Sequence, residues 1–201
     1  MLKGENVIAF ACIAHPRNFF NYLHNFSDNI FLEGHFESEK YFINYKDEIL
    51  DQLTFVHQNQ YKNTPFYSKI LNNNSVGICL RQNRLTEGKN RLNNLNRTKS
   101  EIYTNEQISY INKSASLFKD KISKPIFYIW SNDFNNINFK KFEFDFIPVD
   151  LSIYKEEQDI RATSLFLLSK CKHFITIPST FSWWGAWLST NKSKIIMRPS
   201  T

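Results

Sequence analysis

Short apolar runs alternate with segments of helical periodicity in the carboxyl-terminal two thirds of the chain. Five runs have the length and composition of buried strands, at residues 75–80, 125–130, 144–149, 173–177 and 193–197. Between them, apolar residues at spacings of three and four predict helices over residues 104–118 and 156–171 and from about residue 178. Alternating strands and helices predict an α/β fold with a mainly parallel, doubly wound sheet.

The amino-terminal part has a mixed pattern. Residues 36–55 predict an amphipathic helix that begins near Ser38 and places Phe42, Tyr45 and Ile49 on one face. A short helix is expected at residues 65–71. These patterns divide the chain into a mainly helical connecting region, residues 1–74, and a sheet domain, residues 75–201.

Two of the predicted helices carry more detail. The spacing of Thr104 and Gln107 is that of a capping box, which predicts that a helix begins at Thr104. The helix at residues 156–171 places one set of side chains on a single face. This set is Ile160, Ser164, Leu167, Leu168 and Cys171.

Polar residues follow three of the predicted strands, where ligands bind in doubly wound sheets. They supply a basic side chain, a polar turn and a hydroxyl-rich helix start, which together predict a nucleotide-phosphate pocket. The candidate donor-binding residues are Arg81, Asn132, Asp133, Ser179, Thr180 and Ser182.

The stretch PSTFSWWGAWLS, residues 178–189, holds three of the four tryptophans of the chain. Trp183, Trp184 and Trp187 lie at helical spacings, which favours a core role over a ligand platform. The hydroxyls ahead of them have two open interpretations, as caps of the helix or as contacts to an anionic ligand.

The composition is that of a globular protein, with 42% hydrophobic and 16% aromatic residues. The net charge of +6 and the pI of about 9.1 favour an anionic partner. The basic excess gathers in residues 81–99, but this stretch contains no aromatic residue and no nucleic-acid-binding motif. A nucleic-acid partner is therefore not expected.

Neither the cysteines nor the histidines indicate a metal site. Cys12, Cys79 and Cys171 are far apart and form no CxxC pair, so no disulfide framework is predicted either. The five histidines lack metal-ligand spacing, and His173, beside a buried strand, is expected to be structural. Free cysteines fit a reducing cytoplasm best.

The apolar run at residues 7–14 resembles the core of a signal peptide. Glu5 interrupts the basic flank that a signal peptide needs, which favours a buried element instead. No other apolar run is long enough to span a bilayer.

Four segments, in order, resemble the bacterial α-1,2-fucosyltransferases (glycosyltransferase family 11). They are FLEGHFESEKYF at 31–42, SVGICLRQNR at 75–84, FYIWSND at 127–133 and CKHFITIPSTFSWWGAWL at 171–188. The resemblance covers most of residues 30–200. It implies a GT-B-type enzyme with two Rossmann-like lobes that transfers fucose from GDP-fucose to a galactoside hydroxyl, with inversion and without a cofactor or an essential metal.

This chain is similar to the carboxyl-terminal lobe of that family plus the connecting region. The glycine-rich opening of the family's amino-terminal lobe is absent, so we expect a fragment or a shortened gene product. The implied partners are GDP-fucose and a galactose-containing oligosaccharide or glycolipid of surface-polysaccharide or lipopolysaccharide assembly. The implied location is cytoplasmic, with peripheral association at the inner face of a bacterial membrane.

The family's arginine motif is only partly present. The family usually has His-X-Arg-Arg, then Gly or a similar residue, then Asp, and CLRQNR at residues 79–84 stands in those places. Arg81 matches the arginine expected on the donor pyrophosphate, where one charge-assisted contact contributes about 1.5–3 kcal/mol. Cys79 replaces the histidine expected near the base, Gln82 replaces the second arginine, and Arg84 replaces the acid.

The polar turn also departs from the family. Its paired acids help to read guanine, and here Asn132 and Asp133 occupy their positions. Asp133 keeps a carboxylate that can accept both the ring N–H and the exocyclic amine of guanine, a pairing that adenine does not offer. Ser164 stands where the family often has an acid that faces the site.

No carboxylate is assigned as a catalytic base, so the catalytic residues stay unknown at this stage. Two hypotheses follow. The chain is part of an inverting fucosyltransferase, or it is a degenerate nucleotide-sugar binding module that folds without turnover, because one lobe is missing and the arginine motif is altered.

Overall fold

The computed structural model describes residues 39–41, 43–55, 57–86, 94–152 and 160–199. By its internal contacts the chain divides into two compact units, residues 1–54 and residues 55–201. Helices α3 (Gln58–Lys62) and α4 (Tyr67–Asn72) belong to the second unit, which also holds the whole sheet.

The first unit corrects one predicted helix. Two short 3-10 turns, η1 (Glu39–Tyr41) and η2 (Ile43–Tyr45), precede a seven-residue helix, α2 (Lys46–Gln52), in place of one helix from Ser38. Ile49 is buried as expected, but Tyr45 is 50% exposed. Ser38 and Phe42 lie outside the described residues. Aromatic and β-branched residues at 41–45 disfavour a regular helix, because such side chains lose rotamer freedom against the preceding turn.

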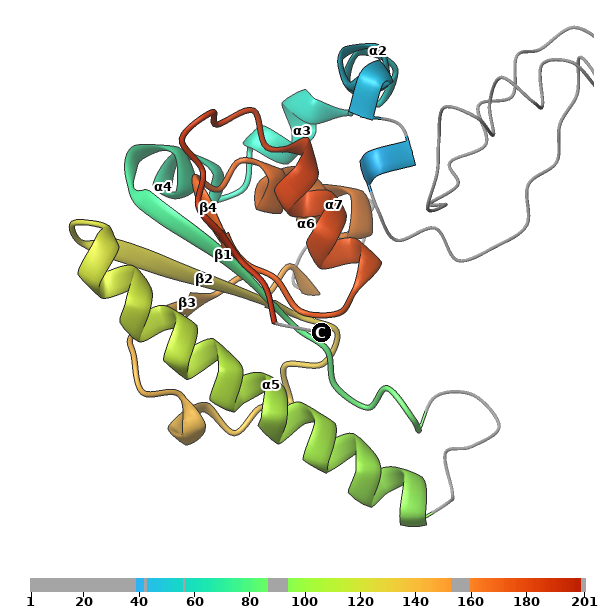
Figure 1. Ribbon diagram of the computed structural model, residues 1–201, viewed down its shortest axis with the longest axis vertical. Coiled ribbons are helices and arrows are strands. Elements are labelled where there is room, and N and C mark those ends of the chain that lie inside the picture. The colour runs from blue at the N-terminus through green and yellow to red at the C-terminus, as the bar shows by residue number, and fades with distance from the viewer. Residues whose placement is uncertain (1–38, 42, 56, 87–93, 153–159, 200–201) are drawn as a thin grey trace, which may run out of the picture. The chain divides into compact units, whose positions relative to one another are not determined.

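The second unit contains a five-stranded parallel sheet in the order β3-β2-β1-β4-β5 (Figure 1). Its central strand, β1 (Asn74–Leu80), pairs over its whole length with β2 (Pro125–Ser131). The outer strands are shorter. They are β3 (Phe146–Pro148), β4 (His173–Ile175) and β5 (Ile196–Met197). The α/β fold with a doubly wound parallel sheet is confirmed.

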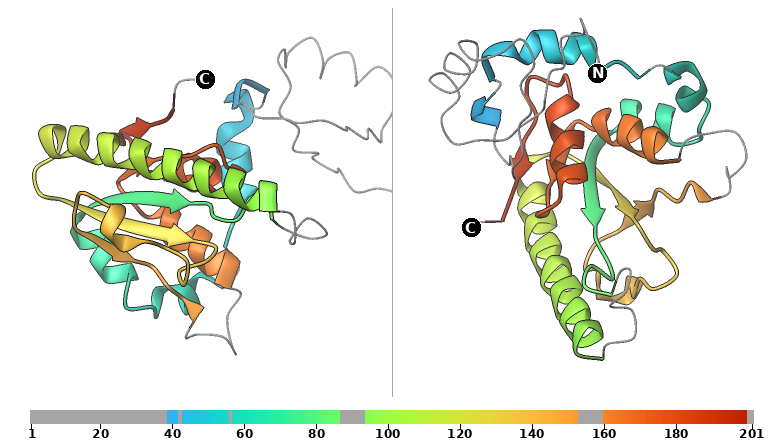
Figure 2. Two further views of the ribbon diagram at one scale, coloured as in Figure 1. Left: turned by 90° about the horizontal axis from the view of Figure 1, so that it is seen from below. Right: turned by 90° about the vertical axis from the view of Figure 1, so that its right-hand side faces the viewer.

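Helices cover both faces of this sheet (Figure 2). On one face lies α5 (Asn94–Lys121), whose Phe118 ring packs 5.9 Å from the ring of His173 on β4. On the other lie α6 (Ile160–Ser169) and α7 (Thr180–Leu188). Gly77 of β1 faces this second layer so closely that an added Cβ would lie 2.7 Å from Leu168 Cδ1. The two helix layers therefore meet the same central strand from opposite sides.

Helix α5 is longer than predicted. It begins at Asn94, so Thr104 and Gln107 lie inside it and the predicted capping box is wrong. The Thr104 hydroxyl donates instead to the backbone oxygen of Ser100, at 2.9 Å. No glycine or proline interrupts residues 94–103. Ser100 and Tyr103 of this segment bond to the loop after β1, contacts that the local pattern does not reveal.

The helix that follows the fourth strand packs against α6. Gly185 of α7 allows the contact, since a Cβ there would lie 2.3 Å from Leu168 Cδ2. Trp187 is buried and its ring stacks on that of Trp183, with centroids 6.1 Å apart and planes 15° apart. Trp184 meets both rings edge-on. The predicted core role is confirmed for Trp187, whereas Trp183 and Trp184 are only half-buried.

Candidate functional site

The three polar segments expected at the site come together at the carboxyl edge of the sheet. The backbone N–H of Gln82 donates to Asn132 Oδ1 at 2.8 Å, and Asn132 Nδ2 donates back to the Gln82 oxygen at 3.1 Å. Arg84 Nη1 donates to the backbone oxygen of Pro178, just before α7, at 3.3 Å. The loop after β1 thus contacts both the turn after β2 and the segment that leads into α7.

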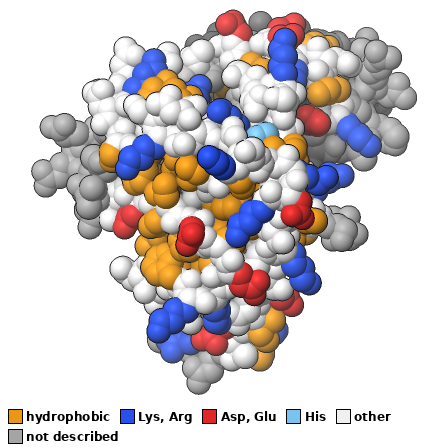
Figure 3. Space-filling model, turned by 90° about the vertical axis from the view of Figure 1, so that its left-hand side faces the viewer, with side chains coloured by type: hydrophobic (Ala, Val, Ile, Leu, Met, Phe, Trp, Pro, Cys, Tyr) orange, Lys and Arg blue, Asp and Glu red, His pale blue; other side chains and the backbone are white. Residues whose placement is uncertain are grey.

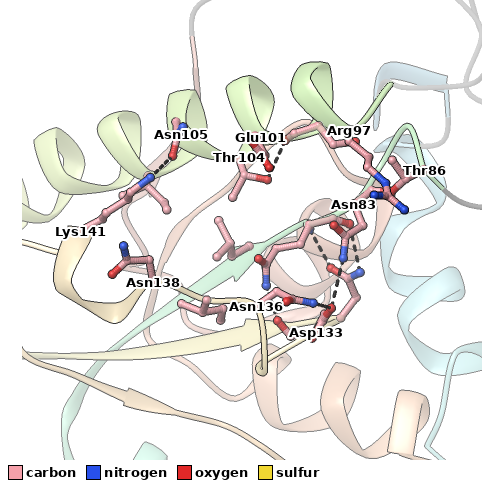
Figure 4. A pocket seen from close by; sticks show the side chains of 16 residues that line it. Asn83, Thr86, Arg97, Glu101, Thr104, Asn105, Asp133, Asn136, Asn138 and Lys141 are labelled. Atoms are coloured by element: carbon pink, nitrogen blue, oxygen red, sulfur yellow. Dashed lines mark hydrogen bonds between the residues drawn. The ribbon is translucent and has the colours of Figure 1, made fainter. Parts of the chain in front are cut away.

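A pocket of about 1020 Å³ opens between the amino-terminal half of α5 and the loops after β1 and β2 (Figure 4). Its apolar lining is Leu80, Ile108 and Ile137. Most of the other lining side chains are amides and hydroxyls, with two cations and two acids among them. These polar residues are Gln82, Asn83, Thr86, Arg97, Ser100, Glu101, Thr104, Asn105, Asn132, Asp133, Asn136, Asn138 and Lys141.

Asp133 is half-buried in this pocket, and three donors converge on its carboxylate. Oδ1 accepts from the backbone N–H of Asn135 at 3.1 Å, and Oδ2 accepts from Asn83 Nδ2 at 3.1 Å and from Asn136 Nδ2. Figure 4 shows both amide side chains directed at this carboxylate. A carboxylate has about four acceptor positions, so a ligand N–H would take the remaining one or replace one of these amides.

Asn83 has a backbone φ of 57°, a left-handed conformation that asparagine tolerates better than most residues. Its carbonyl oxygen accepts from the backbone N–H and the hydroxyl of Thr86, at 3.0 and 3.1 Å. This turn places the Asn83 amide in the pocket. The sequence does not indicate Asn83 as a pocket residue, because nothing in its local pattern distinguishes it.

Gln82 stands where the family has its second arginine, and it is buried with 4% exposure. Its Nε2 donates to Ser131 Oγ at 3.2 Å and to the backbone oxygen of Asp133. The position therefore joins the two loops through hydrogen bonds and brings no positive charge to the pocket.

Arg81 is half-buried, and its backbone is paired with Gln107 of α5. Leu80 and Gln82, on either side of it, line the pocket, whereas Arg81 does not. Side chains alternate between the two faces of an extended chain. Arg81 is therefore directed to the face of Cys79, where the Ser182 hydroxyl at the start of α7 hydrogen-bonds the Cys79 thiol.

The three hydroxyls at the start of α7 have different environments. Ser179 precedes the helix but its side chain makes no capping hydrogen bond, and Thr180 is exposed. Ser182 is 2% exposed, and its Oγ accepts from the backbone N–H of Ile177 at 3.4 Å. None of the three lines the pocket. The structure gives Ser182 a packing role, while Ser179 and Thr180 stay candidate ligand contacts.

Cys79, in place of the family's histidine, is a buried thiol. Burial raises the pKa of Cys79 to about 12, and the hydrogen bond with Ser182 lowers it only partly. The side chain is therefore neutral at physiological pH and belongs to the packing between β1 and α7.

Arg84, in place of the family's acid, lies near the start of α7. Its Nη1 donates to Tyr103 Oη at 2.9 Å, and its guanidinium lies 5.4 Å from the centre of the Tyr103 ring. Together with its contact to Pro178, this links α5 to the segment before α7.

His173 is structural, as predicted. It is buried, and its Nδ1 accepts from the backbone N–H of Ile195 at 3.1 Å. Desolvation, and to a lesser extent the charge of Lys172, lowers the pKa of His173. Within the described residues, no group of three or more His, Cys, Asp or Glu side chains is arranged to hold a metal ion. In the same part of the chain, no helix is both long and apolar enough to cross a membrane.

Comparison with known proteins assigns the chain to a family. The sequence model of the family described as "Glycosyl transferase family 11" matches residues 14–201. The chain belongs to this family. The family match includes the loop after β1, the turn after β2 and the start of α7.

Two curated proteins of Escherichia coli are similar to this family 11 chain. An O-antigen biosynthesis glycosyltransferase, WbnK, is 32% identical over 92 residues, which are 46% of this chain and 30% of that protein. An alpha-1,2-colitosyltransferase is 23% identical over 168 residues, which are 83% of this chain and 54% of that protein. The matched part of the chain thus spans about half the length of these relatives or less.

Proposed function

We propose that this chain is the donor-binding part of a glycosyltransferase that moves fucose, or a related sugar, from a GDP-sugar to a galactoside hydroxyl in O-antigen or other surface-glycan assembly. The family match over residues 14–201 supports this proposal, as does the similarity to an O-antigen biosynthesis glycosyltransferase and to an alpha-1,2-colitosyltransferase. The transfer inverts the anomeric configuration and needs no metal, as the family resemblance implies. A peripheral position at the inner membrane face belongs to the same proposal.

The observation that carries the proposal is the meeting of three loops at one sheet edge, with a polar pocket on one side and a helix start on the other. The base of the donor occupies the pocket, where Asp133 offers the charged acceptor that guanine requires. The charges of Arg97 and Lys141 are balanced there by those of Glu101 and Asp133, which suits an uncharged base rather than a phosphate group.

The donor diphosphate lies beside Arg81 and the start of α7. The helix amino terminus presents backbone N–H groups to an anion, and Ser179 and Thr180 add hydroxyls. As the sugar leaves, negative charge grows on the diphosphate, and both groups stabilise it electrostatically. No side chain is assigned here as the base for the acceptor hydroxyl.

A second candidate function is a nucleotide-sugar binding module without turnover. It is favoured by the neutral Gln82 and Cys79 in the arginine motif, of which Gln82 is engaged in hydrogen bonds between loops and Cys79 is buried against α7. Transfer of fucose from GDP-fucose to a galactoside by the purified chain would eliminate this second candidate.

A nucleic-acid partner is not part of either proposal. On the face shown in Figure 3, basic side chains are interspersed with acidic and hydrophobic ones. Nucleic-acid binding surfaces instead concentrate their basic residues in one patch or stripe.

Calorimetry with GDP tests the phosphate assignment. Arg81→Ala should weaken GDP binding by about 10- to 150-fold, since a charge-assisted contact contributes about 1.5–3 kcal/mol. The control, Lys119→Ala, removes an exposed charge in the last turn of α5 and should leave the affinity unchanged. Equal affinity of the unaltered chain and Arg81→Ala would refute the assignment.

Base selectivity tests the pocket. Asp133→Asn should lower the affinity for GDP and leave that for ADP unchanged, because only guanine donates two N–H groups to the carboxylate. Asp145→Asn makes the same change of charge at an exposed site before β3 and should preserve selectivity. A GDP preference that survives Asp133→Asn would place the base elsewhere.

A further inference from the structure

One face of α5 holds the loop after β1 at three points. Ser100 Oγ accepts from the backbone N–H of Leu85 at 3.0 Å, Tyr103 Oη accepts from Arg84, and Gln107 pairs with Arg81. Spacings of three and four residues place such side chains on the same helical face. The amino-terminal part of α5, which the sequence does not predict, therefore contacts and holds the loop after β1.

The contact at Gln107 consists of two hydrogen bonds to one backbone residue. Gln107 is 5% exposed, its Oε1 accepts from the backbone N–H of Arg81 at 3.1 Å, and its Nε2 donates to the backbone oxygen of Arg81 at 2.8 Å. Asn132 makes the equivalent pair of bonds with the backbone of Gln82. Two consecutive residues are thus held by side-chain amides where β1 has just left the sheet.

This arrangement, the amide clamp of Gln107 and Asn132, determines the direction of the Arg81 side chain. Consecutive side chains of an extended segment point to opposite faces, so a rotation of this backbone would turn Arg81 away from α7. These four bonds fix the backbone of Arg81 and Gln82 and do not involve the guanidinium of Arg81. The clamp restricts the positions that the guanidinium can reach.

We propose that Gln107, together with Asn132, is a positioning residue that holds Arg81 toward the start of α7 for contact with the donor diphosphate. The proposal rests on the donor-binding function proposed above and adds to it two residues without direct phosphate contact. Gln107 acts through Arg81, so removing the amide should matter only while Arg81 is present.

The same helix offers a matched control. Asn112 forms a similar two-bond clamp, with its Nδ2 donating to the oxygen of Lys141 at 2.9 Å and its Oδ1 accepting from the N–H of Glu143 at 3.2 Å. This second clamp holds the segment before β3 and not the loop after β1. Replacing Asn112 removes a comparable two-bond contact to a distant backbone without touching Arg81, whereas Gln107 also donates to the backbone oxygen of Tyr103 within its own helix.

A double-mutant cycle in the full 201-residue chain tests the proposal, with GDP as the calorimetric probe. Gln107→Leu should raise the Kd for GDP about tenfold, whereas Asn112→Leu should change it less than about twofold. In the Arg81→Ala background, Gln107→Leu should have an effect below about twofold, because its route to the ligand is gone. Equal losses in both backgrounds would overturn the positioning role and leave a merely structural one.

Hydrogen exchange provides a second readout that does not need ligand. The Arg81 amide should exchange faster in Gln107→Leu and at the unaltered rate in Asn112→Leu. If Gln107→Leu does not fold, Gln107→Glu replaces it, since the carboxylate still accepts from the Arg81 N–H but cannot donate to the Arg81 oxygen. Failure of the unaltered chain to bind GDP would refute the donor site. An unchanged Arg81 exchange rate in Gln107→Leu, or an unchanged Kd for GDP in Gln107→Glu, would refute the clamp.

Discussion

The two faces of the sheet approach its carboxyl edge in contrasting ways. Beside α6 and α7 the chain is closely packed, with Gly77 and Gly185 both against Leu168 and the thiol of Cys79 enclosed. Beside α5 the same edge carries a pocket of about 1020 Å³ with many amide and hydroxyl side chains. Close packing of apolar side chains holds the first face together, and hydrogen bonds hold the second. Both faces belong to the same central strand, β1.

The contrast bears on the two ligand contacts proposed at the end of β1, the base in the pocket and the diphosphate beside the start of α7. The packed face keeps α7 in place, since Gly185 lets this helix approach Leu168 of α6 closely. The polar face keeps backbone groups satisfied while leaving volume for a ligand. Substitutions should accordingly cost stability on the first face and little stability on the second.

The largest loss of stability is expected from Phe166→Ala. Phe166 on α6 is 1% exposed and its ring lies within 5.2–5.7 Å of the rings of Phe55, Tyr61 and Tyr67. Removing a buried phenyl ring typically costs about 3–5 kcal/mol, because transfer and cavity terms add. Urea unfolding of the purified variant measures this loss.

Phe139→Ala is the control for that prediction, because this ring is 45% exposed and stacks on Phe146 at 5.7 Å. Its loss should be about 1 kcal/mol or less. Comparable losses in the two variants would contradict the description of the α6 layer as the tightly packed one.

A smaller loss is expected from Gly185→Ala. The added methyl would lie 2.3 Å from Leu168 Cδ2, so α6 and α7 must separate or Leu168 must change rotamer, at about 1–3 kcal/mol, partly offset by the better helix propensity of alanine. In the Leu168→Ala background, where the clashing side chain is gone, Gly185→Ala should lower the unfolding free energy less than it does in the unaltered chain. Strictly additive unfolding free energies in that pair would show that the close approach carries no strain.

The packed face is also the part that the sequence predicts best. Apolar runs mark its strands, and the spacing of Trp183 and Trp187 marks a buried helix, because hydrophobic burial leaves a periodic signal within a few residues. Strand ends were less accurate. The third strand is confined to Phe146–Pro148 and the fifth to Ile196–Met197, as outer strands have fewer neighbours to extend them.

The polar face was predicted only in part. The place of Asn132 and Asp133 after a strand predicts their position at the site, but the capping box predicted from Thr104 and Gln107 is wrong, since Gln107 pairs with Arg81. Its true partner, Arg81, lies 26 positions away, and Asn132 and Gln82 are 50 positions apart. Hydrogen bonds between side chains and distant backbone groups leave no local periodicity, so this part of the site requires the folded chain.

His173 should make the stability of the sheet depend on pH. It lies on β4 and accepts a hydrogen bond from the backbone N–H of Ile195, just before β5. The pKa of His173 is lowered in the folded chain, so between that lowered pKa and its ordinary value of 6.5 the unfolded chain binds more protons. Stability from this residue is complete above about pH 6.5 and is lost as the pH falls through the folded pKa.

His173→Gln should therefore flatten the decline in unfolding free energy below pH 6.5. At neutral pH it should cost about 0.5–1.5 kcal/mol for the lost hydrogen bond. His57→Gln, at an exposed position before α3, is the control and should keep the acid-dependent decline. Urea unfolding at several pH values measures the decline. If the unfolding free energy of His173→Gln falls with pH as steeply as that of the unaltered chain, His173 is not the source of the decline.

The smallest effect is expected in the wall of the pocket. Asn105 and Lys141 are both exposed, and Lys141 Nζ donates to Asn105 Oδ1 at 2.6 Å (Figure 4). An exposed polar pair of this kind gains little over its contacts with water, so Asn105→Ala should change the unfolding free energy by less than about 0.5 kcal/mol. A loss above about 1.5 kcal/mol in urea unfolding would mean that the pocket wall is held as firmly as the packing of α6 against α7. The polar face would then be a structural element in its own right, and its open volume would no longer distinguish it as the face that receives a ligand.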